Sequence, residues 1–391
     1  MSVTLAGSMG GVRNINEIGE NTKFLINLLN STSPKQLEEQ WFNLMKEISV
    51  VSIVTNNACN LKCRHCYLNT PLYDKPLSKD EWSRFLDSME EVKPILITVS
   101  GKEFTIDPNK NFFLKSFQKL RNDEIITKFG FITNGILLHR MKDILLETSP
   151  DYVDISIDGI NKTHDLIRGD DAFTKAFPNA IWCSQNLENL TFVNITIQKY
   201  NYDQLIDIFK TLIENDITNV ASNFYKPLPY TDPNLTLSSE QINHVFSLLK
   251  EVKNLKTHKQ FTFLLDLDHI YLPPILHFIK SDWFNPSKLK EDDNKSTVMI
   301  YEFPNNTKII FRLNLAPIGI SRMRITPDGF ILAADDSVNT QNYKRNFIAN
   351  MRDFNYNLRK LHEFAMNSKR LKQIFNDFIN NELPLIKNAL N

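Results

Sequence analysis

Cysteine is scarce in this sequence. Its 391 residues include only Cys59, Cys63, Cys66 and Cys183. Three crowded thiols and one distant thiol make a poor disulfide framework, because structural bridges need cysteines that can pair along the chain. The scarcity argues against a small protein held together by disulfides and raises the question of what the three neighbouring thiols bind.

The sequence also lacks an excess of charge of either sign and any long hydrophobic run. Its 45 acidic and 45 basic residues give zero net charge, which argues against a nucleic-acid partner held by bulk electrostatic attraction. No uncharged apolar stretch is long enough to span a bilayer, and residues 1–20 do not show a charged start followed by an apolar run. We expect a soluble cytoplasmic protein without a secretory signal, a membrane partner or a nucleic-acid partner.

Apolar residues make up 42% of the chain, and from residue 48 onward they alternate between strand-like and helix-like patterns. Ser78 and Glu81 mark the start of one helix as a capping box. The expected strands are 48–56, 95–100, 128–135, 152–159, 190–198 and 217–225, and the helices that follow them are 78–92, 111–121, 136–148, 171–187, 202–216 and 238–252. Parallel strands joined by helical crossovers satisfy this alternation. The sequence therefore predicts an α/β protein with a partial (β/α)6 TIM-like barrel, whose functional loops lie at the carboxyl ends of the strands.

Four segments are expected along the chain. Residues 1–47 form an N-terminal helical segment with two short helices, and residues 48–252 form the barrel. Residues 253–310, with a Pro-Pro pair and a charged run, are expected to be an irregular linker or insertion. Residues 311–391 form a small C-terminal α+β extension, in which two short strands flank a Pro-Asp-Gly turn before further helices.

The stretch CNLKCRHC places three cysteines in the loop after the first expected strand. Thiolates are soft ligands that select iron–sulfur clusters, zinc or copper(I). A structural zinc site needs four ligands, and neither the neighbouring His65 nor a distant Cys/His pair completes one well. On a four-iron cluster, three thiolates leave one iron open to a small chelator. The pattern favours such a cluster, with a zinc site or a chance group of cysteines as the alternatives.

The CxxxCxxC motif of Cys59, Cys63 and Cys66, after the first strand of a strand–helix repeat, resembles that of the radical S-adenosylmethionine (SAM) superfamily. The resemblance extends over roughly residues 48–235. It implies one four-iron–four-sulfur cluster on these cysteines and SAM bound to the open iron through its amino and carboxylate groups. It also implies an external one-electron reductant of the flavodoxin or ferredoxin type and release of a 5′-deoxyadenosyl radical.

A second motif follows the second expected strand. Gly101 and Glu103 in TVSGKEF match a Gly-Gly-Glu-Pro stretch of the family, whereas Lys102 and Phe104 depart from it. The resemblance implies that the matched residues contact the amino group of SAM, since a carboxylate and backbone carbonyls suit an ammonium group. The alternative is an ordinary strand-to-loop turn. Asn134, in the Thr-Asn-Gly end of the third strand, is a further candidate contact or only a turn residue.

The fourth and fifth strands supply the remaining candidate SAM contacts. Ser156 in DISIDG matches a family position that contacts the ribose or carboxylate of SAM. Arg168 in HDLIRG matches an arginine that pairs with the carboxylate in peptide-modifying relatives, and a solvated loop charge is its alternative role. Asn194 and Thr196 share a face of the fifth strand at the level where the family contacts adenosine. His65 takes a position that is often aromatic in the family, which implies packing against the adenine.

Cys183 is the one thiol outside the cysteine loop. A thiol can return a hydrogen atom to a substrate radical, as in radical epimerases, so Cys183 is a candidate hydrogen donor. It lies, however, in the expected helix 171–187 on the outside of the barrel, beside Ile181 and Trp182. A buried structural cysteine is the alternative role, and the sequence favours it.

The C-terminal extension resembles the start of a SPASM or twitch domain, which carries auxiliary iron–sulfur clusters. The match is SRMRITPDGFILAADDS at 321–337, but no cysteine lies beyond Cys183 and Asp335 and Asp336 follow the turn. We expect a degenerate extension that keeps the fold without the metal, with a plain β-hairpin as the alternative. Asp335 and Asp336 are candidate contacts for a cationic substrate. Without an auxiliary cluster as an electron sink, we expect a redox-neutral reaction such as epimerisation or rearrangement.

Three functions remain open. The Arg168 motif and the extension favour a radical SAM enzyme that acts on a ribosomally made peptide. The missing auxiliary clusters, and the lack of a recognisable leader-binding module in residues 1–47, favour a small-molecule substrate such as an aminosugar or nucleoside in natural-product biosynthesis. Lys102 and the degenerate extension leave a non-catalytic metal-binding scaffold as the third hypothesis.

Overall fold

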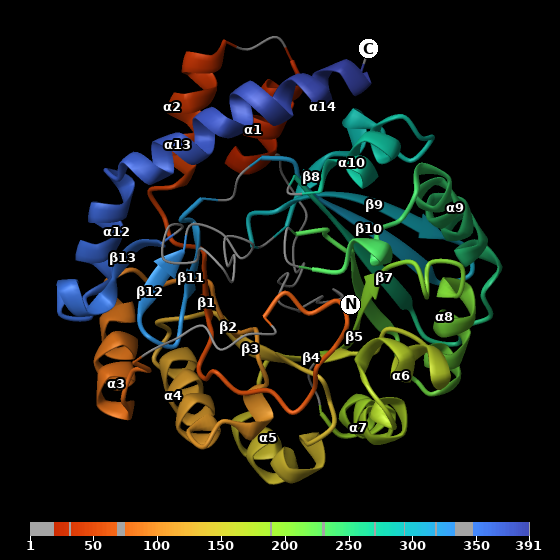
Figure 1. The fold of residues 1–391 in the computed structure, drawn as a ribbon, viewed down its shortest axis with the longest axis horizontal. Helices are drawn as coiled ribbons and strands as arrows, with labels where there is room; N and C mark the ends of the chain where they lie inside the picture. The colour runs from red at the N-terminus through yellow and green to blue at the C-terminus, as the bar shows by residue number, and fades with distance from the viewer. Residues whose placement is uncertain are drawn as a thin grey trace.

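The strands of this protein form one sheet that curls into a partial barrel (Figure 1). The structure is a computed structural model, which describes residues 19–30, 33–68, 75–187, 190–228, 231–269, 271–292, 294–316, 319–332 and 347–390. Within these residues the sheet has 13 strands in the order β13-β12-β11-β1-β2-β3-β4-β5-β6-β7-β10-β9-β8. The strands are β1 (Val50–Ile53), β2 (Leu96–Val99), β3 (Lys128–Thr133), β4 (Tyr152–Ser156), β5 (Leu190–Ile197), β6 (Asn219–Phe224), β7 (Phe261–Asp268), β8 (Lys290–Glu291), β9 (Thr297–Phe303), β10 (Thr307–Asn314), β11 (Arg322–Ile325), β12 (Phe330–Leu332) and β13 (Phe347–Asn350).

The strands from β11 through β1–β7 to β10 run parallel, and antiparallel strands complete the two edges. Helices surround the strands as an outer layer in Figure 1. They are α1 (Glu20–Leu29), α2 (Pro34–Leu44), α3 (Lys79–Asp87), α4 (Lys110–Asn122), α5 (Lys142–Thr148), α6 (Lys162–Arg168), α7 (Ala172–Asn186), α8 (Leu205–Glu214), α9 (Ser239–Leu249), α10 (Leu272–Ile279), α12 (Leu358–Met366), α13 (Lys369–Asp377) and α14 (Leu383–Leu390). This architecture confirms the predicted α/β partial barrel.

Local sequence explains where several elements begin. The Ser78 side chain accepts a hydrogen bond from the Glu81 amide, and the Glu81 carboxylate accepts one from the Ser78 amide, so the expected capping box starts α3. Ser238 and Gln241 form the same arrangement at α9. Every residue of β1, β2 and β4 is buried, as expected for parallel strands covered on both faces.

The expectation of an irregular segment over residues 253–310 is wrong. The segment contains β7, which pairs in parallel with β6, and also contains α10, β8, β9 and the start of β10. All residues of β7 from Phe261 to Leu265 are buried, as in a parallel strand covered on both faces, and only Asp266 and Asp268 at its end are partly exposed. The Pro-Pro pair lies in the first turn of α10, where a missing N–H removes no helical hydrogen bond. The sheet is therefore continuous across the expected boundaries at 252 and 310.

The C-terminal extension joins the barrel through its first hairpin. Residues Arg322–Ile325 of β11 pair in parallel with β1, and β12 pairs with β11 in the antiparallel sense. The turn between β11 and β12 is the expected Pro-Asp-Gly sequence, in which Gly329 has φ of 85° and the Thr326 hydroxyl donates to Asp328. The hairpin thus supplies a strand to the edge of the barrel beside the cysteine loop.

The N-terminal helices pack against the C-terminal helices, although more than 300 residues separate them in the sequence. Trp41 of α2 stacks on Phe375 of α13 with ring centroids 5.0 Å apart. The ring of His362 in α12 lies 2.7 Å from the carbonyl oxygen of Met45. The described part of residues 1–47 contains α1 and α2, and these contacts join its end to the C-terminal helices.

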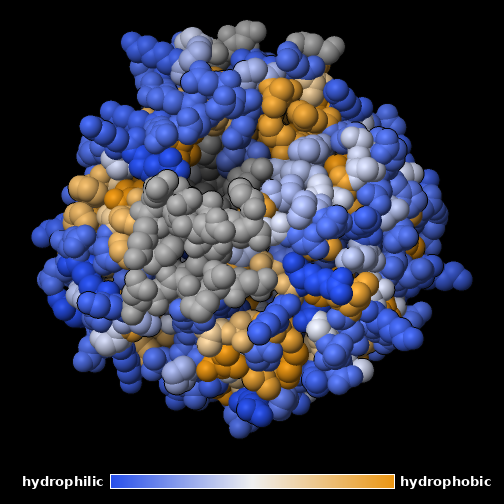
Figure 2. Space-filling model, in the orientation of Figure 1, coloured by the Kyte–Doolittle hydropathy of each residue, from blue (hydrophilic) through white to orange (hydrophobic). Residues whose placement is uncertain are grey.

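Hydrophilic residues cover most of the face shown in Figure 2, and hydrophobic residues gather there in separate patches. The large hydrophobic side chains that are exposed among the described residues are Leu146, Leu166, Phe364 and Leu385, which lie on different helices. Among the described residues, no helix combines the length and the apolar character that crossing a membrane requires.

Candidate active site

A cavity of about 540 Å³ lies at the carboxyl ends of the parallel strands. Its walls include the cysteine loop and residues at the ends of successive strands, among them Thr133, Ser156, Thr196, Phe224, Asp268 and Asn314. All predicted cluster and SAM residues line it: Cys59, Cys63, His65, Cys66, Gly101, Glu103, Asn134, Ser156, Arg168, Asn194 and Thr196. The fold therefore brings together residues from five strand–loop connections, as expected for the functional face of a barrel.

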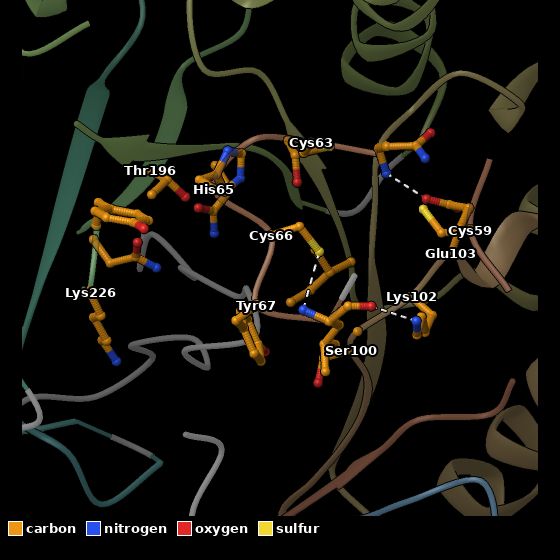
Figure 3. Close-up of a pocket in the computed structure, with 18 of the residues that line it drawn as sticks. Cys59, Cys63, His65, Cys66, Tyr67, Ser100, Lys102, Glu103, Thr196 and Lys226 are labelled. Atoms are coloured by element: carbon orange, nitrogen blue, oxygen red, sulfur yellow. Dashed lines mark hydrogen bonds between the residues drawn. The ribbon is translucent and has the colours of Figure 1, made fainter. Parts of the chain in front are cut away.

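The three cysteines of the loop face this cavity from one side (Figure 3). The backbone N–H of Leu61 lies 3.5 Å from the Cys59 sulfur, and that of Leu68 lies 3.3 Å from the Cys66 sulfur. Burial raises the pKa of all three thiols, that of Cys63 to about 11. Positive side chains oppose this effect, because Arg168 lowers the pKa of Cys63 while Lys102 lowers those of Cys59 and Cys66.

The donor set fits a four-iron cluster better than a single metal ion. Among the described residues, no three Cys, His, Asp or Glu side chains converge closely enough to hold one ion. A closed zinc site requires such convergence, whereas each thiolate on a cluster binds a different iron atom. The His65 ring lies beside Asp158, with its Nε2 3.8 Å from that carboxylate. The structure thus offers three sulfur donors around one cavity, together with backbone N–H groups that donate to two of them.

The loop after β2 keeps a glycine-like backbone although lysine replaces one glycine. Gly101 has φ of 86° and Lys102 has φ of 54°, both in the left-handed region that glycine favours. A Cβ atom at Gly101 would lie 2.6 Å from Arg324 Nη2 and 2.8 Å from Leu68 Cδ1, so a larger residue would displace these side chains and strain the backbone. The Lys102 ammonium donates a hydrogen bond to the Leu68 carbonyl, which ties this loop to the end of the cysteine loop.

Glu103 is almost completely buried and accepts hydrogen bonds from the loop after β2 and from the end of β3. Its Oε1 accepts from the Thr105 amide at 2.9 Å and from the hydroxyls of Thr105 and Thr133 at 2.7 Å. Its Oε2 accepts from the Asn134 amide at 2.8 Å (Figure 3). Glu103 therefore fixes the end of β3 relative to the loop after β2, in addition to lining the cavity.

Asp158, two residues after Ser156, is fully buried and organises the other wall. Its Oδ2 accepts from Arg168 Nε at 2.6 Å, and its Oδ1 accepts from the Thr196 amide at 2.8 Å. Burial alone would raise the pKa of Asp158, but Arg168 and two neighbouring histidines hold it below its ordinary value. Sequence reasoning assigned no role to Asp158, although its position in DISIDG, ten residues before Arg168, was the available signal.

Two buried histidines flank this carboxylate. Burial lowers the pKa of His65 and of His164 to about 4, so both are neutral near pH 7. His164 Nδ1 accepts a hydrogen bond from the Asp158 backbone N–H at 3.0 Å. His164 therefore orders the β4–α6 connection, while the His65 ring lies against the cavity beside Asp158.

The remaining predicted residues also make internal contacts. The Asn194 side-chain amide donates to Asp154 at 3.1 Å. The Asn134 side-chain amide donates to Asn60 of the cysteine loop at 2.7 Å. Asn134 Oδ1 also accepts from the Ile136 backbone N–H, as expected for a turn residue. Asn134 thus has a turn role and a cavity-lining position together.

The structure does not bring Cys183 into this site. Cys183 lies in α7, is fully buried in the hydrophobic core, and is not among the residues that line the cavity. Burial raises the pKa of its thiol to about 12. The prediction of Cys183 as a hydrogen donor to substrate is therefore unsupported, and the buried structural role agrees with its position. Asp335 and Asp336, the other candidates, lie outside the described residues.

Sequence reasoning missed the far wall of the cavity, because it treated residues 253–310 as irregular. Figure 3 shows Lys226 and Thr196 on the side of the cysteine loop opposite Lys102 and Glu103. Beyond Thr196, the far wall carries Asn223, Lys226, Asp266, Asp268, His269 and Asn314. The alternating pattern of FTFLLDLD at 261–268 was the signal that would have placed both aspartates at a strand end.

Charged groups pair across this far wall. Lys226 Nζ lies 3.3 Å from the Asp268 carboxylate, and His269 Nδ1 lies 3.2 Å from it. Asp266 Oδ1 accepts from the Asn314 side-chain amide at 2.7 Å. Burial raises the pKa of Asp266 to about 6, and the neighbouring Asp268 adds to the rise. This wall therefore holds a paired, largely fixed set of charges and one carboxyl group that titrates just below neutral pH.

The C-terminal hairpin also contributes to the site. Arg324 of β11 is buried, and its guanidinium donates to the Tyr67 hydroxyl at 3.2 Å and to the Ser100 carbonyl at 3.3 Å. It thereby connects the cysteine loop with the end of β2. Sequence reasoning had no means to see this contact, because Arg324 lies 257 residues from Tyr67.

Comparison with known families agrees with this geometry. Residues 53–218 match the family model of the radical SAM superfamily. The match runs from the last residue of β1 through the cysteine loop to just past the end of α8, and so confirms the resemblance carried by the cysteine motif. Residues 53–218 therefore match the radical SAM superfamily in sequence, and the match includes the three-cysteine loop.

Particular relatives resemble parts of the chain. The sporulation killing factor maturation protein SkfB of Bacillus subtilis (strain 168) is 28% identical over 156 residues, which cover 39% of this chain and 36% of SkfB. The Fe-coproporphyrin III synthase of Methanosarcina barkeri (strain Fusaro / DSM 804) is 30% identical over 167 residues, 42% of this chain and 40% of that protein. The matched regions thus span about two fifths of these relatives' lengths.

Among solved structures, Streptococcus suis SuiB bound to its precursor peptide SuiA is similar in fold. The TM-score is 0.61 at 15% sequence identity, and the match covers 88% of this chain and 73% of SuiB. At this identity the similarity concerns the fold, and it covers more of the chain than residues 53–218.

Proposed function

We propose that this protein is a radical SAM enzyme in which Cys59, Cys63 and Cys66 hold one four-iron–four-sulfur cluster and SAM binds at the iron that lacks a protein ligand. When bound, the cluster supplies one electron to SAM and so generates the 5′-deoxyadenosyl radical that takes a hydrogen atom from the substrate. The observation that carries the proposal is that the thiols of Cys59, Cys63 and Cys66 line one cavity, whereas no fourth thiol among the described residues lines it.

The cavity offers a place for each part of SAM. We assign the amino acid end to Gly101, Glu103, Ser156 and Arg168, which combine acceptors for an ammonium group with a guanidinium for a carboxylate. Glu103 of the β2 loop lies near Cys59 (Figure 3), and Arg168 Nη1 lies 4.0 Å from the Cys63 sulfur. Asn134, Asn194, Thr196 and His65 are left to contact the nucleoside end.

We propose that the substrate binds against the far wall, at the ends of β6, β7 and β10. Lys226, Asp266, Asp268 and His269 line the same cavity as the cysteines, but the SAM assignment uses none of them. A hydrogen atom must pass directly between substrate and cofactor, so the two must share one cavity. Paired charges at this wall suit a polar substrate rather than a purely apolar one.

The substrate class that we propose is a ribosomally made peptide. Two relatives support it: SkfB is named a maturation protein of a killing factor, and SuiB was solved with a precursor peptide bound. A small molecule is the second candidate, and the similarity to a named Fe-coproporphyrin III synthase favours it. Deuterium transfer into 5′-deoxyadenosine separates the two classes. We expect transfer from a deuterated precursor peptide encoded beside this protein's gene, and transfer only from a small molecule would contradict the peptide assignment.

We further propose a redox-neutral reaction. No cysteine follows Cys183, so the described hairpin offers no ligand for an auxiliary cluster. Because Cys183 is buried in the core, the structure gives no support to an epimerisation that uses this thiol as the hydrogen donor. A rearrangement in which 5′-deoxyadenosine returns its hydrogen atom needs no such donor. The count of SAM molecules consumed per product tests this: a rearrangement consumes fewer than one, and one per product would contradict it.

The setting that we propose is a reducing cytoplasm with a flavodoxin or ferredoxin as electron donor and without a nucleic-acid or membrane partner. All four cysteines are free thiols in the structure, which agrees with such a compartment.

The proposed activity is testable without a known substrate. Reconstituted wild-type protein, incubated anaerobically with SAM and dithionite, is expected to form 5′-deoxyadenosine and methionine. Cys63→Ala is expected to lose iron and this cleavage, whereas Cys183→Ala is the matched control that retains both, since Cys183 lies outside the cavity. Equal loss in both variants, or no cleavage by the wild type, would overturn the proposed function and favour the non-catalytic scaffold.

A further inference from the structure

Asp158 and Arg168 form a buried ion pair next to Cys63 of the cysteine loop. Asp158 is fully buried, and four backbone or side-chain groups fix it in place. Arg168 Nε donates to Oδ2, the Thr196 amide donates to Oδ1, the Asn201 side chain donates to the backbone carbonyl at 2.7 Å, and the Asp158 amide donates to His164. Two of these hydrogen bonds fix the carboxylate and two fix the backbone, so Asp158 provides a rigid support for the guanidinium that it binds.

The position of Arg168 follows from this support. Arg168 is the last residue of α6, and its side chain is only 10% exposed. Because Asp158 takes the Nε edge of the guanidinium, the Nη end points toward the cysteine loop, and Nη1 lies 4.0 Å from the Cys63 sulfur. Cys63 is itself buried, so little solvent separates the two groups. A guanidinium has five N–H donors, and the remaining ones are left for a carboxylate in the cavity.

The charges of Arg168 and Asp158 both lie close to the Cys63 sulfur. The positive guanidinium of Arg168 lies 4.0 Å from this sulfur, and the negative carboxylate of Asp158 lies on the other side of that guanidinium, 2.6 Å from its Nε. Hydrogen bonds to cluster sulfurs and the net charge nearby are two of the factors that set the potential of an iron–sulfur cluster. An N–H directed at Cys63 stabilises the additional negative charge of the reduced cluster.

We propose that Asp158 is a positioning residue that orients Arg168 so that one guanidinium N–H contacts the Cys63 sulfur, and that this contact raises the reduction potential of the cluster. The inference rests on the proposed function, because it presupposes the cluster. It adds a role for Arg168 beyond SAM binding and gives Asp158 a role that acts through Arg168.

The positioning role and a simple charge effect predict opposite signs for one variant. Asp158→Ala removes a negative charge near the cluster, which by charge alone shifts the potential upward. If Asp158 acts by orienting Arg168, the same variant loses the N–H contact to sulfur and the potential shifts downward. Asp158→Asn keeps an oxygen that accepts from Arg168 Nε, so its potential is expected at or above that of the wild type. Asp158→Asn also keeps the test informative where Asp158→Ala does not fold.

Arg64 provides a matched control for Arg168. Arg64 directly follows Cys63 in the sequence, but its guanidinium lies at Tyr200, with Nη1 3.5 Å from the hydroxyl. Arg64→Gln therefore removes the same charge next to the same ligand without removing a contact to sulfur. Arg168→Lys keeps the charge but loses the planar fork that Asp158 orients.

The experiment is an anaerobic redox titration of the reconstituted full chain, followed by the electron paramagnetic resonance signal of the reduced cluster, without substrate or turnover. We expect a lower potential for Arg168→Gln, Arg168→Lys and Asp158→Ala than for the wild type, and a clearly smaller shift for Arg64→Gln. Equal shifts for Arg168→Gln and Arg64→Gln, or a higher potential for Asp158→Ala, would overturn the inference while the proposed function stands. A wild type without a reducible cluster would instead overturn the proposed function.

Discussion

At the scale of single residues, the site depends on polar side chains that are satisfied by the protein itself. Glu103 is the clearest case, because its two carboxylate oxygens accept hydrogen bonds from the Thr105 amide, two threonine hydroxyls and the Asn134 amide. Each of these groups would lose its partner in a buried region if the carboxylate were removed. The motif residue that resembles a SAM contact is thus also a structural link between β2 and β3.

Glu103→Gln is therefore expected to lower stability as well as SAM binding. Glutamine carries an NH2 group in place of one carboxylate oxygen, so at least one of the groups that donate to Glu103 would face another donor. We expect this to lower the free energy of unfolding by about 2–4 kcal/mol. Urea denaturation of the apo-protein under reducing conditions measures the change. The matched control is Glu147→Gln on α5, whose side chain is 55% exposed and pairs only with Lys115, and we expect a change of about 0.5 kcal/mol or less there. Equal stability of the wild type and Glu103→Gln would contradict this structural role.

At the scale of elements, the end of β7 places two aspartates two residues apart on the same face, with opposite consequences for stability. Asp266 has a pKa raised from 3.8 to about 6 by burial, so its folded state binds a proton more tightly than its unfolded state. Its contribution therefore favours folding at low pH and is lost as pH rises from about 4 to about 6. Asp268 instead pairs with Lys226 and His269.

Asp266→Asn is expected to raise the free energy of unfolding at pH 7.5 by about 1–3 kcal/mol and to leave it nearly unchanged near pH 4. Asparagine keeps an oxygen for the Asn314 amide and removes the cost of a buried charge. Asp268→Asn, the neighbouring comparison, is expected to destabilise the protein at pH 7.5, because the ion pair between Asp268 and Lys226 is then lost. Chemical denaturation at the two pH values measures the change in stability of both variants. Destabilisation by Asp266→Asn at pH 7.5 would refute the raised pKa of Asp266.

A second element-scale contact joins α3 to the C-terminal extension. The Glu81 carboxylate accepts from Arg352 Nε at 2.8 Å and from the Tyr356 hydroxyl, in addition to its capping bond from Ser78. Arg352, followed by Tyr356 and Ser78, lowers the pKa of Glu81 to about 2. A carboxylate with a lowered pKa stabilises the folded state above its ordinary pKa, and this stability is lost as pH falls toward 2.

Glu81→Gln keeps the capping geometry but removes the charge. We expect the free energy of unfolding at pH 7 to fall by about 1–2 kcal/mol, a modest value because the pair is partly exposed to solvent. The difference from the wild type is expected to shrink as pH falls below about 4.5. Urea denaturation over this range is the measurement, and a difference that does not vary with pH would show that the pairing of charges is not its cause.

At the scale of the whole molecule, local pattern predicted the fold as far as β6, and long-range packing decided the rest. The six strand–helix units follow from apolar runs and capping boxes such as Ser78 with Glu81, which are signals within a few residues. β7 was missed because the Pro-Pro pair and the charged run around it outweighed its own alternation. The contact of Arg324 with the cysteine loop depends on strand order alone, which no local pattern contains.

The candidate site likewise has one part that the sequence predicted and one part that it did not. The thiols and the SAM-motif residues were predictable, because a family motif fixes their spacing in the sequence. Asp158 and the far wall were not, because their roles depend on which groups the folded chain places around them. Lys226 and Asp268 show this most simply, since a strand and its crossover helix separate two residues that form an ion pair.

The account as a whole requires SAM to bind the cluster directly through an iron atom that the protein leaves without a ligand. Electron–nuclear double resonance of the reduced, reconstituted protein with SAM isotopically labelled at its amino nitrogen tests this most directly. The account predicts a coupling between the labelled nitrogen and the cluster that disappears in Cys63→Ala. A protein that binds stoichiometric zinc, or a cluster that shows no coupling to the labelled SAM, would contradict it.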